Sequence, residues 1–192
     1  MATFRMTELF KQLGVPGPDL LLRECGRQVF PLLADELSTV SPGHALTLDF
    51  SGVQVMDTSF CDETVLELAI RLVEGKHGDR FLVLSEPTSA TIDNIEGAIG
   101  RRRAKIALIV RERGGERLVG RAYGDPIEPN LVEAWEYLRR ERSLTARALA
   151  DDLNLEINTA SMRLHKLYTL RLAAREEEVS AAGRQHNYSI PN

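Results

Sequence analysis

An interruption of every periodic pattern at residues 123–130 is the feature that most constrains the fold of this chain. The segment reads YGDPIEPN, and its prolines, glycine and acidic residues are typical of a break between structural units. With 192 residues, the chain is long enough to build a small core on each side of the break. We therefore predict a first domain over residues 1–124, a linker over residues 125–130 and a second domain over residues 131–192.

The composition is that of an ordinary folded protein. Hydrophobic residues make up 43% of the chain and charged residues 27%, which excludes wholesale disorder, collagen and disulfide-scaffold classes. The formal net charge is −4, and neither side of the break is basic. No global positive field attracts nucleic acid or an anionic membrane, so any such binding must be local.

Cysteine usage and the first residues of the sequence favour a cytoplasmic location. Cys25 and Cys61 lie in apolar segments without metal-ligand spacing, which is typical of buried free thiols in a reducing environment. The opening MATFRMTELFKQLG lacks a signal-peptide pattern, and no run of about 18 apolar residues occurs. We expect a cytoplasmic protein that does not contact the membrane.

Helical and strand patterns alternate before the break. Apolar residues recur at helical spacing over residues 20–37, 65–72 and 88–99, and short apolar runs over 45–50 and 81–84 predict strands. Two further runs, 105–110 and 117–123, flank Gly114 and Gly115 and predict a hairpin. Because helices connect some of these strands, we predict an α/β domain with a mixed sheet and helices packed on it.

After the break, the pattern predicts three helices and a hairpin. Apolar stripes run over residues 131–138, 146–153 and 160–170; Ser143 or Thr145 could cap the second helix, and Asn158 or Thr159 lies near the start of the third. Residues 172–179 and 185–190 then bracket a loop of small residues.

The stretch LTARALADDLNLEINTASMRLHKLYTLRLAAREEE, followed by GRQHNYSI, resembles the winged helix-turn-helix domains of bacterial transcription regulators over about residues 131–190. The resemblance implies that the third helix enters a DNA major groove and that the hairpin is the wing. The expected DNA-binding residues are on the outward side of the helix and at the wing tip: Asn158, Thr159, Ser161, Met162, Arg163, His165, Lys166, Arg184 and His186.

The charge of this second domain leaves another class open. Residues 126–192 carry 9 basic and 10 acidic side chains, and three of the acids are the glutamates at residues 176–178 in a wing strand. Because phosphate binding depends on cations that release counterions, DNA binding would need charges segregated to one face or two copies acting together. A homodimer is therefore expected. The alternative is a protein-interaction adaptor whose winged helix docks another protein.

An upstream motif, LTLDFSGVQVMDTSFCDETVLELA at residues 46–69, resembles the STAS family founded by bacterial anti-anti-sigma factors. It is closer still to STAS-like domains with an SFxDE signature, and the resemblance covers about residues 20–110. It implies a hydroxyl phosphorylated by an anti-sigma-type kinase, with Ser59 as the first candidate, Thr58 as the second and Asp57 as the capping acid. Phe60 stands where the family has glycine, and the alternative is that these three residues merely cap the next helix.

No motif for an enzyme, a cofactor or a metal stands out in the sequence. Phosphate loops, paired catalytic carboxylates and nucleophile elbows are missing, and Cys61 has no histidine predicted beside it, which favours a core residue. We therefore expect a regulatory protein that is not an enzyme and binds no cofactor or metal. In this hypothesis a STAS-like domain docks a regulatory partner or senses a signal, and the linker transmits the change to a DNA-binding domain that regulates transcription.

Overall fold

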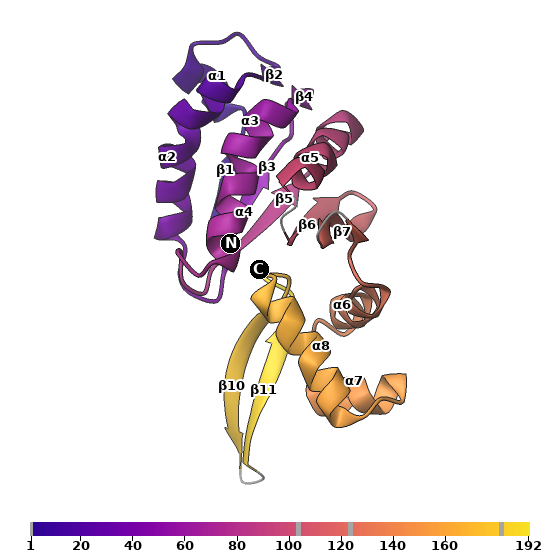
Figure 1. Cartoon of the computed structure of the whole chain (residues 1–192). Coiled ribbons are helices and arrows are strands. Elements are labelled where there is room, and N and C mark those ends of the chain that lie inside the picture. Colours follow the sequence, from indigo (N-terminus) through magenta and orange to yellow (C-terminus); the bar gives the residue numbers. More distant parts are fainter. Residues whose placement is uncertain (1, 103–104, 123–124, 181–182) are drawn as a thin grey trace.

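A computed structural model describes residues 2–102, 105–122, 125–180 and 183–192 (Figure 1). Within these residues, the largest sheet has the strand order β1-β3-β5-β6-β7-β8. Strands β1, β3, β5 and β6 are parallel, whereas β7 is antiparallel to β6 and to β8. The strands are β1 (Ala2–Arg5), β3 (Ala45–Asp49), β5 (Phe81–Ser85), β6 (Ile106–Glu112), β7 (Gly115–Ala122) and β8 (Asp125–Pro126).

Helices cover the first face of this sheet. They lie in the segments that connect the parallel strands, and a short pair of strands, β2 (Asp19–Leu20) and β4 (Val55–Met56), lies beside them. Their apolar stripes share one core with Leu48 of β3, Leu84 of β5 and Leu108 of β6. The helices of this part are α1 (Glu8–Leu13), α2 (Arg23–Thr39), α3 (Thr58–Glu63), α4 (Val65–Val73) and α5 (Ser89–Arg102).

The rest of the chain, residues 127–192, forms a C-terminal unit. It contains α6 (Pro129–Glu141), β9 (Ser143–Thr145), α7 (Ala146–Leu153), α8 (Ile157–Thr169), β10 (Ala174–Ser180) and β11 (Gly183–Ser189). The last two strands make an antiparallel hairpin, and β9 pairs with β11. Figure 1 shows this hairpin projecting away from the large sheet.

The C-terminal unit packs against the second face of the large sheet. Phe81, Val83 and Ile109, whose side chains alternate with those of the first core, share a second core with Trp135 and Leu167 of the C-terminal unit. Both faces of β5 and β6 are therefore covered. This explains why their sequences, FLVL and IALIV, are continuously apolar rather than alternating.

Polar contacts reinforce this junction. Arg171 follows α8, and its guanidinium donates Nε to Leu72 O and Nη1 to Asp79 Oδ1, both at 2.9 Å. The amide of Ala45 in β3 donates to Asn192 O, also at 2.9 Å. The two parts of the chain are thus joined by a shared core and by hydrogen bonds near the start of β3 and β5.

The prediction of a mixed α/β structure is confirmed, with differences in detail. The helix expected from residue 20 begins at Arg23, because Leu20 pairs in β2. The strands β1, β2, β8 and β9 and the helix α1 were not predicted, since most of them are too short to show a period. Residues 125–130, predicted as a linker, hold β8 at the sheet edge and the first residues of α6.

Candidate functional site

The turn between α7 and α8 sets the geometry of the candidate site. Thr145, rather than Ser143, caps α7, because its Oγ1 accepts a hydrogen bond from Ala148 N at 3.3 Å. The helix ends at Asn154, whose left-handed backbone (φ 51°) suits asparagine. Leu149 of α7 and Leu164 of α8 are fully buried in the same core, which holds the two helices together.

One face of α8 is open to solvent. Its exposed side chains are Asn158, Ser161, Met162 and His165, whose spacing places them on a single stripe of the helix. We call these four residues the α8 stripe. Met162 is 68% exposed, and Thr159 lies half-buried beside the stripe. The α8 stripe contains no Lys, Arg, Asp or Glu.

Arg163 and Lys166 do not lie on that stripe, contrary to expectation. Arg163 is only 16% exposed and donates Nη1 to Glu133 of α6 at 2.8 Å. Lys166 forms an ion pair with Glu128. Because α6 packs beside α8, Glu133 of α6 and Glu128 just before it draw both cations toward α6, and Lys166 keeps 40% of its side chain exposed.

A groove of about 460 Å³ lies between the start of α8 and the hairpin. Arg147 of α7, Asn158 and Ser161 of α8, and Arg184 and His186 of β11 line it. Arg184 is 79% exposed, and Arg147 and His186 are exposed as well. Of the predicted residues, the structure therefore brings Asn158 and Ser161 of the helix to the same groove as Arg184 and His186 of the hairpin.

Two arginines beside this site were not among the predicted residues. Arg147, the second residue of α7, lines the groove. Arg175 of β10 lies over the Tyr168 ring at 4.2 Å from its centroid and 3.5 Å from His165 Nδ1. Strand alternation could have indicated Arg175, since it faces the same side of the hairpin as Tyr188, its register partner.

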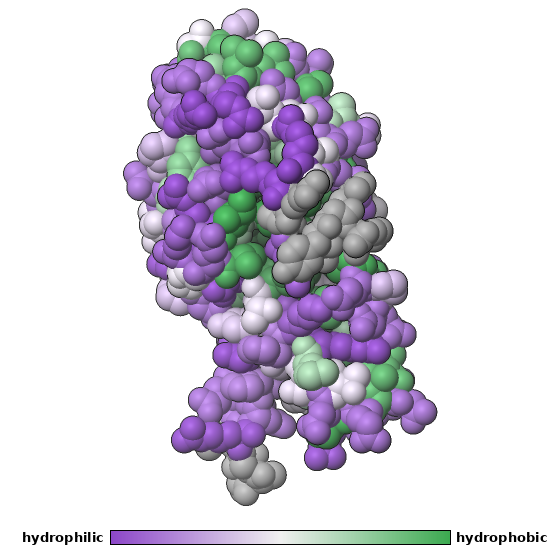
Figure 2. Space-filling model, viewed as in Figure 1, coloured by the Kyte–Doolittle hydropathy of each residue, from purple (hydrophilic) through white to green (hydrophobic). Residues whose placement is uncertain are grey.

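Many acids of the C-terminal unit are paired with cations. Along α6 and at Glu128, which precedes it, the pairs are Glu128 with Lys166, Glu133 with Arg163, Glu136 with Arg139, and Glu141 with Arg140. In the hairpin, Glu177 lies 3.5 Å from Arg184, whereas Glu176 and Glu178 alternate onto the opposite face. Figure 2 shows the hydrophilic surface of this hairpin.

In the sheet part, Asp57 is a helix cap. Its Oδ1 accepts a hydrogen bond from Phe60 N at 2.7 Å, and its Oδ2 accepts one from Leu22 N at 3.0 Å. The capping role expected of Asp57 is therefore confirmed. Thr58 donates to Asn94 Oδ1 at 3.1 Å, and Ser59 is half-buried in the first turn of α3. Phosphorylation at Ser59 or Thr58 stays a prediction.

The two acids of the SFxDE motif bind arginines from neighbouring helices. Asp62 lies 3.0 Å from Arg23 of α2 and 2.7 Å from Arg102 of α5, and Glu63 pairs with Arg23. Burial raises the pKa of Asp62, but hydrogen bonds from Arg102 and Arg23 outweigh it and leave the pKa below its usual value. The acids thus tie α3 to α2 and α5.

Cys61 is a core residue, as predicted. It is fully buried, and burial, together with the neighbouring charge of Asp62, raises the pKa of its thiol to about 12. A thiol with this pKa remains protonated at neutral pH and is a poor nucleophile. Cys25 and Cys61 are both free, but Cys25, which was expected to be buried as well, is only half-buried.

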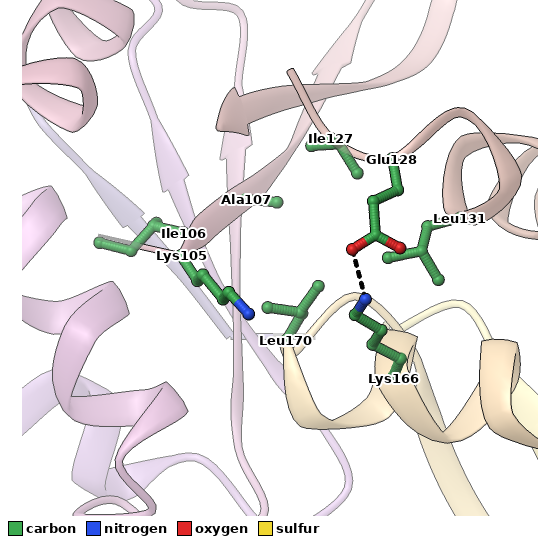
Figure 3. A pocket seen from close by; sticks show the side chains of 8 residues that line it. All are labelled: Lys105, Ile106, Ala107, Ile127, Glu128, Leu131, Lys166 and Leu170. Atoms are coloured by element: carbon green, nitrogen blue, oxygen red, sulfur yellow. Dashed lines mark hydrogen bonds and ion pairs between the residues drawn. The ribbon is translucent and has the colours of Figure 1, made fainter. Parts of the chain in front are cut away.

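A small apolar pocket lies at the junction of the two parts (Figure 3). It is lined by Ala107, Ile127, Leu131 and Leu170, and the Lys166–Glu128 ion pair lies at its side. Its volume of about 10 Å³ has room for no more than one water molecule. This pocket is a packing seam between the sheet and the C-terminal unit.

Comparisons with protein-family models, curated proteins and solved structures found no match to this chain. Among residues 2–102, 105–122, 125–180 and 183–192, no group of His, Cys, Asp and Glu is arranged to hold a metal ion. None of the helices in this described part is both long and apolar enough to span a bilayer.

Proposed function

We propose that the chain is a DNA-binding transcription regulator and that its C-terminal unit is a winged helix-turn-helix. In this proposal α8 is the recognition helix and the β10–β11 hairpin is the wing. The observation that carries it is the α8 stripe beside a groove lined by Arg147 and Arg184, with Arg175 next to His165 of the stripe. Neutral hydrogen-bonding groups would face base edges in the major groove, and the arginines would reach phosphates on either side.

The charge distribution supports DNA as the ligand despite the acidic total. The four glutamates of α6 and its N-terminal flank are neutralised by ion pairs, and none of the four lines the groove. Tyr137 of α6 donates a hydrogen bond to Asp152, which raises the tyrosine pKa and directs this acid toward α6. The groove arginines Arg147 and Arg184 are exposed, and Glu177 is the acid that lies beside Arg184.

Binding of the whole chain to a duplex labelled with a fluorophore tests this proposal. We expect affinity to fall steeply with salt, and Arg147→Ala or Arg184→Ala to reduce the slope of log K against log salt by about 1 each. Arg27→Ala is the matched control, because Arg27 is an exposed cation on α2, outside the groove. An equal loss in Arg27→Ala, or no binding at any ionic strength, contradicts the proposal; the latter result favours the protein-docking adaptor.

The sheet part is the regulatory half of this proposal, a STAS-like domain that receives a partner or a signal. Ser59 is the proposed phosphoacceptor, at a helix start where added phosphate would lie beside the carboxylate of Asp57. Ser59→Asp should change the affinity for DNA or for the partner relative to Ser59→Ala. Equal affinities of the two variants contradict a switch at this residue.

A further inference from the structure

We infer that the α8 stripe reads A·T base pairs and that the side chain of Met162 contacts the 5-methyl group of a thymine. This inference deepens the proposed function and rests on it. It concerns which base pairs the helix selects, whereas the proposed function concerns only whether duplex DNA binds.

Met162 is unusually exposed for an apolar side chain. At 68% it is the most exposed large apolar side chain among the described residues, although it lies at the centre of a polar helix face. In the free protein Met162 belongs to neither of the two hydrophobic cores. A thymine methyl is the apolar group that the major groove offers, and contact with it would remove both groups from water.

The α8 stripe has no charged side chain with which to read a G·C pair. Guanine is read most often by Arg or Lys, which donate to its O6 and N7, and cytosine by an acid that accepts from its N4. The two cations of α8 are held away by Glu133 and Glu128, so the outward stripe has no such residue. The stripe therefore has no strong reader for either base of a G·C pair.

The neighbours of Met162 on α8 also suit an A·T pair. Asn158 lies one helical turn before it, and an asparagine amide can accept from adenine N6 and donate to adenine N7. Ile157, 43% exposed at the start of α8, adds a second apolar side chain beside the groove. An amide and apolar side chains on one helix face match the adenine and thymine edges of the major groove.

Base analogues test this inference. The whole chain would first select binding sites from a pool of random duplexes of about two turns. In the selected site, each thymine would then be replaced by uracil, which lacks only the methyl group. We expect one thymine at which this change weakens binding about fourfold, the size expected for one buried methyl group. Replacement of the neighbouring adenine by 7-deazaadenine should weaken binding as well.

Variants assign the effect to Met162. Met162→Ala should bind the thymine and uracil duplexes equally, whereas Met162→Leu should retain the preference because it keeps an apolar side chain of similar volume. Met162 is exposed, so neither change should affect folding. If no thymine is sensitive to uracil, or if Met162→Ala keeps the preference, the inference is overturned while the DNA-binding proposal survives. If no duplex binds even at low salt, both are overturned.

Discussion

At the residue scale, Asp57 connects two parts of the backbone that are far apart in sequence. One carboxylate oxygen caps α3, and the other holds Leu22, a residue with positive φ just before α2. Asp57→Ala should lower the free energy of unfolding by about 1–3 kcal/mol, because it removes a cap and leaves a second amide without its acceptor. Asp57→Asn should lose less, since asparagine also caps helices well. Equal losses of unfolding free energy in the two variants, measured by urea denaturation, would contradict the capping role of Asp57.

Gly120 lies where β7 comes too close to β6 for a side chain. Its φ is 153°, and an added Cβ would lie 2.3 Å from Ile106 O of the paired strand β6. Gly120→Ala should therefore push β7 away from β6 and destabilise the protein by several kcal/mol, about 3 or more. Gly100→Ala is the control, because nothing lies within 4 Å of an added Cβ there. Thermal melting of the two variants measures the difference.

At the element scale, α3 is a short helix held by charge as well as by packing. Asp62 pairs with Arg23 and Arg102, and these arginines keep its pKa below the value in the unfolded chain. The SFxDE motif thus contributes to the fold by fixing α3 between α2 and α5. Its acids do not surround an open site in this structure.

The Asp62 ion pairs predict a pH dependence of stability. A carboxyl with a lowered folded-state pKa contributes stability above its unfolded pKa of about 3.9, and this stability is lost as the pH falls through the folded pKa. Asp62→Asn should therefore lower the free energy of unfolding by about 1–3 kcal/mol at pH 7. The difference from the wild type should shrink below about pH 4. A constant difference over pH 3–7, measured by urea denaturation, contradicts the role of this charge.

At the scale of the whole molecule, the two parts share a core, so they should unfold together. Trp135 is the only tryptophan of the sequence and lies in the C-terminal unit, so its fluorescence reports on that unit. Arg171→Ala removes the hydrogen bonds to Leu72 and Asp79. It should lower the free energy of unfolding, measured by tryptophan fluorescence in urea, by about 1–3 kcal/mol.

The wild-type fluorescence transition should coincide with the circular-dichroism transition, which reports on the whole chain. Arg140→Ala is the control, because Arg140 is 62% exposed and its ion pair with Glu141 and its contact with the Tyr137 ring both lie within α6. This control should change stability by no more than about 0.5 kcal/mol. Separate transitions in the wild type would show that the shared core does not couple the two parts.

The order of elements could be predicted because periodicity is a local property. The runs at residues 45–50 and 81–84 were correct as strands, and the stripe over 146–153 was correct as α7. The capping acid Asp57 and the core residue Cys61 were also identified, since capping and burial depend on near neighbours. The four-residue strand β1 shows no period, so only its pairing with β3 reveals it.

Periodicity along the chain indicates which segments are apolar on one side or on both, and hence a mixed α/β structure. What covers the second face of the sheet is known only from the folded chain, because an apolar run shows that a partner is needed without naming it. The same holds for the direction of the cations of α8. Arg163 and Lys166 pair with glutamates more than 25 positions away, and this attraction depends on how α6 packs against α8 rather than on spacing along the chain.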